Sequence, residues 1–288
     1  MGEITPIHIK DVEKTLDRLV EAFGNYPIDR LTEDDWRRWA QLLTHKAKPN
    51  EPLSPIARDQ HLRRLRAFLS WLKAQSWAPT VNVGTALKPV PRKLVRAQVE
   101  RAKSRPISPQ DIRAVLEIAN PLMRCCILLA ANAAMYPIDL AALTGREIRG
   151  QWLVTTRSKT GTGRRAYLWP ETLEALKAYE QPRPRDPASE PLLLLTARGN
   201  PLQDSKGVTP VSPDLAKLCK QAGCKFTMID LRRIFQSEAA NGTGDLQAIA
   251  ETMGHVQSSM AAGYTRAISD QRIERASLAV RTWLFGNG

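Results

Sequence analysis

Three side chains in the last quarter of the chain could act together on a phosphate. Arg232 lies in Asp-Leu-Arg-Arg, His255 in Met-Gly-His and Tyr264 in Gly-Tyr-Thr-Arg. The arginine precedes the histidine by 23 residues, and the histidine precedes the tyrosine by nine. A guanidinium and an imidazole can hold the non-bridging oxygens while a phenol oxygen attacks in line. The pattern therefore indicates attack of a tyrosine on a DNA phosphate.

The composition bounds what could position these side chains. The 288 residues suffice for two modest domains or one large domain. The net charge of +13 favours a polyanionic partner, with nucleic acid ahead of a membrane surface. A generally basic protein without such a partner is the alternative.

Nothing in the sequence suggests secretion or a membrane. No N-terminal segment resembles a signal peptide, and the longest apolar run, 125–136, is too short to cross a bilayer. The spacing of the cysteines does not suit a metal, so we expect buried, reduced thiols in a cytoplasmic protein. The cysteines are Cys125, Cys126, Cys219 and Cys224.

The first 89 residues predict a small helical domain of four or five helices. Apolar residues recur at helical spacing over 9–23, Thr32 can cap a second helix, and Ser54 followed by proline can begin a third. The third helix has a leucine stripe from Leu62 to Leu72 and an opposite basic face, which could be solvated or lie along phosphates. That face holds Arg58, His61, Arg63, Arg64 and Arg66.

Residues 90–105 form a basic linker, in which prolines at 89 and 91 argue against a continuous helix at the start. The linker could follow DNA or be a solvated tether.

The remaining residues, 106–288, predict a mostly helical domain with one small antiparallel sheet. Ser108 can cap its first helix, and the apolar segment around 121–134 should be a buried helix. Segments 152–157 and 164–169 read as two strands joined by a hairpin with two glycines. Further helices are expected from Pro170, Ser212, Ile229, Asp245 and Ser269.

This organisation and the Arg-His-Tyr intervals closely resemble the tyrosine recombinases, or phage integrases. The resemblance implies a helical core-binding domain and a catalytic domain that close as a C-shaped clamp on duplex DNA. It implies a covalent 3′-phosphotyrosine intermediate and no metal or nucleotide cofactor. Tyr264 matches the nucleophile, Arg232 the second catalytic arginine and His255 the histidine that hydrogen-bonds the phosphate. Lys159 matches the lysine that protonates the leaving 5′ oxygen.

Each of these residues also has an ordinary structural explanation. Tyr264 could be a half-buried tyrosine on an amphipathic helix, Arg232 a member of a surface ion pair, His255 a helix cap and Lys159 an exposed turn lysine. Their agreement in order and interval favours the family site.

Two positions depart from the family pattern. Where the family has a segment like Gly-Leu-Arg-Ile-Ser-Glu-Leu, residues 134–140 read Ala-Met-Tyr-Pro-Ile-Asp-Leu, so Tyr136 replaces the first arginine. Arg146 offers a rival alignment, but it leaves little room for a strand before Lys159. Ile229 stands three residues before Arg232, where the family usually has a polar residue, most often histidine.

These departures predict duplex-DNA binding with strand cleavage lost or strongly impaired. Losing one preorganised donor costs about 10²–10³ in rate, and losing a transition-state arginine about 10³–10⁵. Arg233 or Arg124 could substitute for the missing arginine. The expected role is regulation, replication or assembly on a mobile element or plasmid in the bacterial cytoplasm. The alternatives are an active site-specific recombinase and a partner of an active recombinase.

The basic residues expected to contact DNA come from both domains. They are Arg58, Arg63, Arg64, Arg92, Lys93, Arg157, Lys159, Arg164, Arg165, Arg232 and Arg233. The last helix has an apolar surface that could dock on a second protomer bound to DNA or on its own domain.

Overall fold

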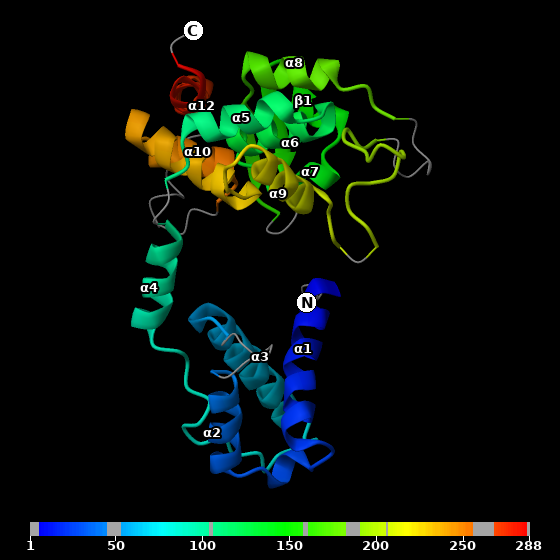
Figure 1. The fold of residues 1–288 in the computed structure, drawn as a ribbon, viewed down its shortest axis with the longest axis vertical. Coiled ribbons are helices and arrows are strands. Elements are labelled where there is room, and N and C mark those ends of the chain that lie inside the picture. The colour runs from blue at the N-terminus through cyan, green and yellow to red at the C-terminus, as the bar shows by residue number, and fades with distance from the viewer. Residues whose placement is uncertain are drawn as a thin grey trace. The chain divides into compact units, whose positions relative to one another are not determined.

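The computed structural model describes residues 6–44, 53–103, 106–157, 161–182, 191–205, 207–255 and 268–286. The chain divides into two compact units, Met1–Pro106 and Ile107–Gly288, and each has its own hydrophobic core (Figure 1). Both units are mostly helical, and the second contains a small antiparallel sheet, which confirms the predicted fold class. Within the described ranges, no helix is both long and apolar enough to cross a bilayer.

The first unit is built on α1 (Pro6–Phe23), α2 (Glu33–Leu42) and α3 (Pro55–Ala74). Trp36 and Trp39 of α2 are fully buried, and the predicted leucine stripe of α3 packs into the same core. Both predicted caps are present. The Thr32 hydroxyl accepts a hydrogen bond from Asp35 N–H at 3.3 Å, and the Ser54 hydroxyl accepts one from Ala57 N–H at 3.2 Å.

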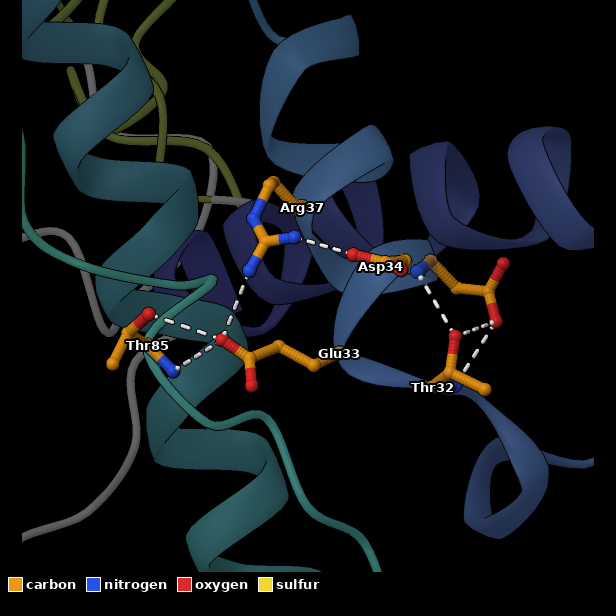
Figure 2. A network of polar contacts seen from close by, with 6 residues as sticks. Thr32, Glu33, Asp34, Arg37 and Thr85 are labelled. Carbon is orange, nitrogen blue, oxygen red and sulfur yellow. Dashed lines mark hydrogen bonds and ion pairs between the residues drawn. The ribbon is translucent and has the colours of Figure 1, made fainter.

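A polar network ties α2 to the loop after α3 (Figure 2). The Glu33 carboxylate accepts hydrogen bonds from the backbone N–H and the hydroxyl of Thr85, each at 3.0 Å, and pairs with Arg37 at 3.1 Å. Gly84 has a left-handed φ of +48°, and a Cβ added there would lie 2.2 Å from Glu33 Oε2. The backbone conformation and the close approach both favour glycine.

The basic linker contains a helix that the prolines did not lead us to expect. After Pro91, residues Arg92–Lys103 form α4, which packs on α3. Asp59 accepts from Val90 N–H and Gln98 accepts from Ile56 N–H, both at 3.1 Å. Before Pro89, the described residues form three α-helices and one 3₁₀ turn (Ile28–Arg30), fewer than the four or five helices expected.

The prediction that His61 lies on the basic face of α3 is wrong. This side chain is only 9% exposed, and its Nδ1 lies 2.8 Å from the Thr15 hydroxyl of α1. Burial, followed by the nearby Arg18 and Arg64, lowers the pKa of His61 to about 4. His61 is therefore a neutral residue between α1 and α3.

The second unit surrounds the buried α6 (Pro121–Asn132). Its other long elements have the following bounds: α5 (Pro109–Ile118), α8 (Pro170–Ala178), α9 (Val211–Gln221), α10 (Met228–Thr243), α11 (Leu246–Met253) and α12 (Asp270–Phe285). Two short elements, α7 (Pro137–Ala142) and the 3₁₀ turn η2 (Gly145–Glu147), lead into the sheet. All four cysteines are buried and free, as expected.

The sheet has three antiparallel strands in the order β1 (Ile148–Arg149), β2 (Trp152–Thr156) and β3 (Gly163–Tyr167). The predicted hairpin is confirmed, with Val154 opposite Arg165 and Thr155 opposite Arg164. The two-residue β1 was not predicted because so short a strand has no readable alternation.

A buried polar network fixes the sheet against the helices. The Asn132 amide nitrogen donates to Tyr167 O at 2.8 Å and to Ser277 Oγ at 2.9 Å. Its carbonyl accepts from Trp169 N–H at 2.8 Å and from the Thr172 hydroxyl at 2.9 Å. One satisfied amide thus joins α6, β3, α8 and α12.

The C-terminal helix packs within its own unit. Ile273, Ala276, Val280 and Leu284 of α12 are buried, mainly against α10, with α5, α6, α11 and β3 also in contact. This apolar face is covered in cis, which agrees with the second of the two alternatives, docking of the helix on its own domain.

Candidate active site

Arg232 is held deep in the second unit by α10. Thr227 caps this helix, and its hydroxyl accepts from Asp230 N–H at 3.3 Å. The Arg232 side chain is 3% exposed, and its guanidinium donates to Ala134 O and to Met253 O, the latter at 2.8 Å. These partners are carbonyls rather than carboxylates, so Arg232 does not belong to a surface ion pair.

His255 follows the end of α11 and lies beside Arg232. Gly254 ends α11 in a left-handed conformation, with φ of +59°. Arg232 Nη2 lies 3.0 Å from His255 Nε2, and arginine can only donate, so this nitrogen accepts and the ring is neutral. Partial burial, then Arg232 and Arg157, hold the pKa of His255 below its usual value, in agreement with a neutral ring.

Tyr136 completes the same cluster from the start of α7. The guanidinium carbon of Arg232 lies 4.5 Å from the Tyr136 ring centroid, and that of Arg157 lies 5.3 Å from it. The aromatic ring is therefore a cation–π partner of two arginines. Arg146, the rival for the first-arginine position, is exposed and lines a surface pocket with Gln181 and Pro191.

The β2–β3 hairpin brings a third arginine to the cluster. Arg164 of β3 is 2% exposed, and its Nη1 lies 3.5 Å from Asp139 Oδ2 on α7. Burial, with repulsion from Arg232 and Arg157, lowers the pKa of Arg164 to about 10, although Asp139 opposes the shift. The Cβ position of Gly254 lies 3.4 Å from Arg164 Cδ and 3.5 Å from Arg157 Cβ. A side chain at Gly254 would thus make ordinary contacts with both arginines, so it is the left-handed backbone that favours glycine here.

Two of the predicted chemical residues, Lys159 and Tyr264, lie outside the described residues. Ile229 is 46% exposed on the first turn of α10, three residues before Arg232. Arg124, one suggested substitute for the missing arginine, donates to Leu116 O at 2.9 Å. Arg233, the other, is exposed and pairs with Asp230 at 3.0 Å.

The other residues that were expected to contact DNA differ in burial and in their ion pairs. Arg165 pairs with Glu251 at 3.2 Å and Asp270 at 2.6 Å, which joins β3 to α11 and α12. Arg64 pairs with Asp11, whereas Arg58 is half-buried. In the first unit, α3 and the segment 89–96 line a groove with several arginines and one acid. Its charged residues are Asp59, Arg63, Arg66, Arg92 and Arg96. Lys93, next to Arg92 on α4, is exposed.

Arg157 and Arg164 were predicted at DNA, but their place in the Arg232–His255 cluster was not predicted, and neither was a role for Asp139. A signal was present for Arg164, since residues 164, 166 and 168 alternate onto one face and two of them are apolar. Over the described ranges, no group of three or more His, Cys, Asp or Glu side chains could hold a metal ion.

Comparisons with solved structures support the fold. The chain has a TM-score of 0.65 and 15% identity to the Tn1549 transposon integrase in complex with transposon right end DNA, covering 96% of this chain and 94% of that one. It has a TM-score of 0.63 and 15% identity to a lambda integrase dimer bound to a COC′ core site, covering 93% of each chain. A lambda integrase tetramer bound to a Holliday junction gives a TM-score of 0.59 and 16% identity, over 92% of this chain and 73% of that one.

A search among curated proteins found no match. The model of the phage integrase family matches residues 105–270, which is more than half of the chain and includes every residue of the cluster described above. The chain has the tyrosine recombinase fold and belongs to the phage integrase family.

Proposed function

We propose that this protein binds duplex DNA at a specific site through its recombinase fold, and that its own strand cleavage is lost or strongly impaired. Its role is then to regulate, replicate or assemble complexes on a mobile element or plasmid. The observation that carries the proposal is the aromatic ring of Tyr136 at the first-arginine position, packed against Arg157 and Arg232.

The physical reason is the charge of the transition state. Two arginines normally clamp the extra negative charge that develops on the non-bridging oxygens. Tyr136 contributes at most one neutral donor, and Ile229 contributes none. Binding depends instead on many phosphate contacts, which the net charge of +13 and the arginine-lined groove of the first unit favour. The Tn1549 and lambda integrases of similar fold were solved with DNA.

An active recombinase is the second candidate, and one observation favours it. Arg157 and Arg164 both lie beside the groups that contact Arg232, so the site is not short of positive charge. In that case the hairpin arginines stabilise the transition state of cleavage in addition to holding the phosphate.

Duplex binding is tested by selecting bound sequences from a random duplex pool and measuring affinity against salt. The proposal predicts enrichment of a defined site and a log affinity that falls by about 0.9 per log of salt for each phosphate neutralised. Salt-insensitive binding, or no binding at low salt, contradicts it.

A further inference from the structure

We propose that Arg164, together with Arg157, replaces the missing first arginine as a ligand of the DNA phosphate in this site. The inference rests on the proposed function and names residues of the β2–β3 hairpin as the groups that hold the phosphate. Four observations support it.

The first observation is the state of the Arg164 guanidinium. The side chain is 2% exposed, yet Nε, Nη1 and Nη2 are all buried without a hydrogen-bond partner in the part of the chain that the structure describes. Arg157 Nε is likewise buried and has no hydrogen-bond partner among the described residues. Leaving a buried charged donor unsatisfied is costly, and native proteins do so rarely. An oxyanion is the partner that a planar, multidentate guanidinium fits best.

The second observation is the concentration of charge. Arg157 and Arg232 both contact the ring of Tyr136, and both oppose the charged form of Arg164. Two acids favour the charged form of Arg164. Asp139 lies 3.5 Å from it and also accepts a hydrogen bond from Tyr136 N–H at 3.1 Å, and Glu147 is the second. Three guanidiniums beside two carboxylates leave a net positive charge, and a phosphate would offset it.

The third observation is where Asp139 lies. It occupies the acidic position three residues after the missing arginine, in the segment that aligns with the family pattern. In this chain, the guanidinium beside that acid belongs to Arg164 of β3 rather than to a residue at position 136. The guanidinium next to this acid therefore comes from the hairpin rather than from the start of α7.

The fourth observation is the arrangement around Arg232. Two backbone carbonyls and His255 already occupy much of its donor capacity. Arg232 alone therefore has few N–H groups left for a phosphate, whereas the buried nitrogens of Arg164 make no hydrogen bond within the described residues and only Nη1 lies near an acid. The Tyr136 ring contacts the guanidiniums of Arg157 and Arg232 without adding charge.

Two probes test the proposal on the full-length chain. Inorganic phosphate should raise the melting temperature of the unmodified protein at constant ionic strength, since a ligand that binds only the folded state stabilises it. Arg164→Gln should remove most of this rise, and Arg157→Gln should reduce it. The selected DNA duplex should bind Arg164→Gln about 10- to 100-fold more weakly than it binds the unmodified protein.

The matched control is Arg198→Gln, which removes the same charge from an exposed position of the second unit that was not expected to contact DNA. It should keep the response to phosphate and lose little affinity for DNA. If Arg164→Gln does not fold, as judged by circular dichroism, Arg157→Gln provides the same comparison, because Arg157 is half-exposed.

The outcomes separate the inference from the proposed function. If no duplex binds the unmodified protein, the proposed function itself fails. If duplex binds but neither hairpin variant weakens binding more than Arg198→Gln does, the inference is overturned. If the variants abolish the phosphate response but leave DNA affinity unchanged, the site holds a free anion and the inference as stated is also overturned.

Discussion

His255 shows how a neighbouring charge sets the chemistry of a single residue. Its Nε2 accepts from Arg232, and the lowered pKa keeps the ring neutral in the free protein. The imidazole should therefore titrate below its usual value of about 6.5 in the free protein. The measurement is an NMR titration of the ring, with His255→Gln to assign the signal. A pKa at or above 6.5 without DNA would contradict this picture of the site.

Binding of DNA should move the same pKa upward. A phosphate beside the ring favours the imidazolium, and it also draws Arg232 away from Nε2. The titration repeated with saturating duplex should therefore give a higher value than the free protein. An unchanged value would place the bound phosphate away from His255.

The residue at position 136 should control rate more than affinity. Tyr136→Arg with Ile229→His supplies a guanidinium and an imidazole where the family has them, and should raise covalent Tyr264–DNA adduct about 10²–10³-fold. The substitution also adds a fourth guanidinium near Arg157, Arg164 and Arg232, so the free variant should be less stable. Thermal melts with and without DNA provide the folding control. Stronger binding without more adduct would show that charge at this position is not the limiting factor.

For the helices and strands, the sequence predicted features that depend on neighbouring residues, but it did not predict contacts between distant segments. Thr32, Ser54 and Ser108 each begin a helix as predicted, because a cap depends only on the next few residues. The docking of α4 on α3 and the burial of His61 depend on partners far along the chain. For the same reason, the spacing in the sequence indicated Arg232 and His255, but it did not indicate the ion pair between Arg164 and Asp139.

His61 makes the packing of α1 on α3 sensitive to pH. Its folded pKa of about 4 lies below the unfolded value near 6.5, so its contribution is complete above pH 6.5 and is lost as pH falls toward 4. The loss should be about 3 kcal/mol over that window. Hydrogen exchange of α1 and α3 amides can follow it, with His61→Gln as the reference. Equal pH dependence in the protein and the variant would exclude His61 as the cause.

Gly242 sets the approach of α10 to α12. A Cβ added there would lie 2.7 Å from Ala279 Cβ, so Gly242→Ala should destabilise the second unit by about 1–3 kcal/mol. The compensating pair Gly242→Ala with Ala279→Gly restores the space and should recover part of the loss. Chemical denaturation of both variants measures the coupling. Additive effects of the two substitutions would show that this contact is not the origin of the loss.

For the whole molecule, α12 belongs to the core of the second unit. Removing residues 268–288 would expose the apolar faces of α10 and α6 and delete Ser277, a partner of Asn132. The truncated chain should therefore lose the cooperative unfolding of this unit, as seen by calorimetry. A truncated protein that still folds and loses only cooperative assembly on DNA would indicate docking between protomers instead.

The proposed function requires that the protein holds DNA but cuts it poorly or not at all. The most direct test is incubation of the unmodified protein with a nicked suicide substrate that carries the selected site, followed by denaturing electrophoresis. The proposed function predicts saturable binding of this substrate with little or no covalent protein–DNA band. A strong covalent band that Tyr264→Phe abolishes would contradict it, and the chain would then be an active recombinase with a rearranged site.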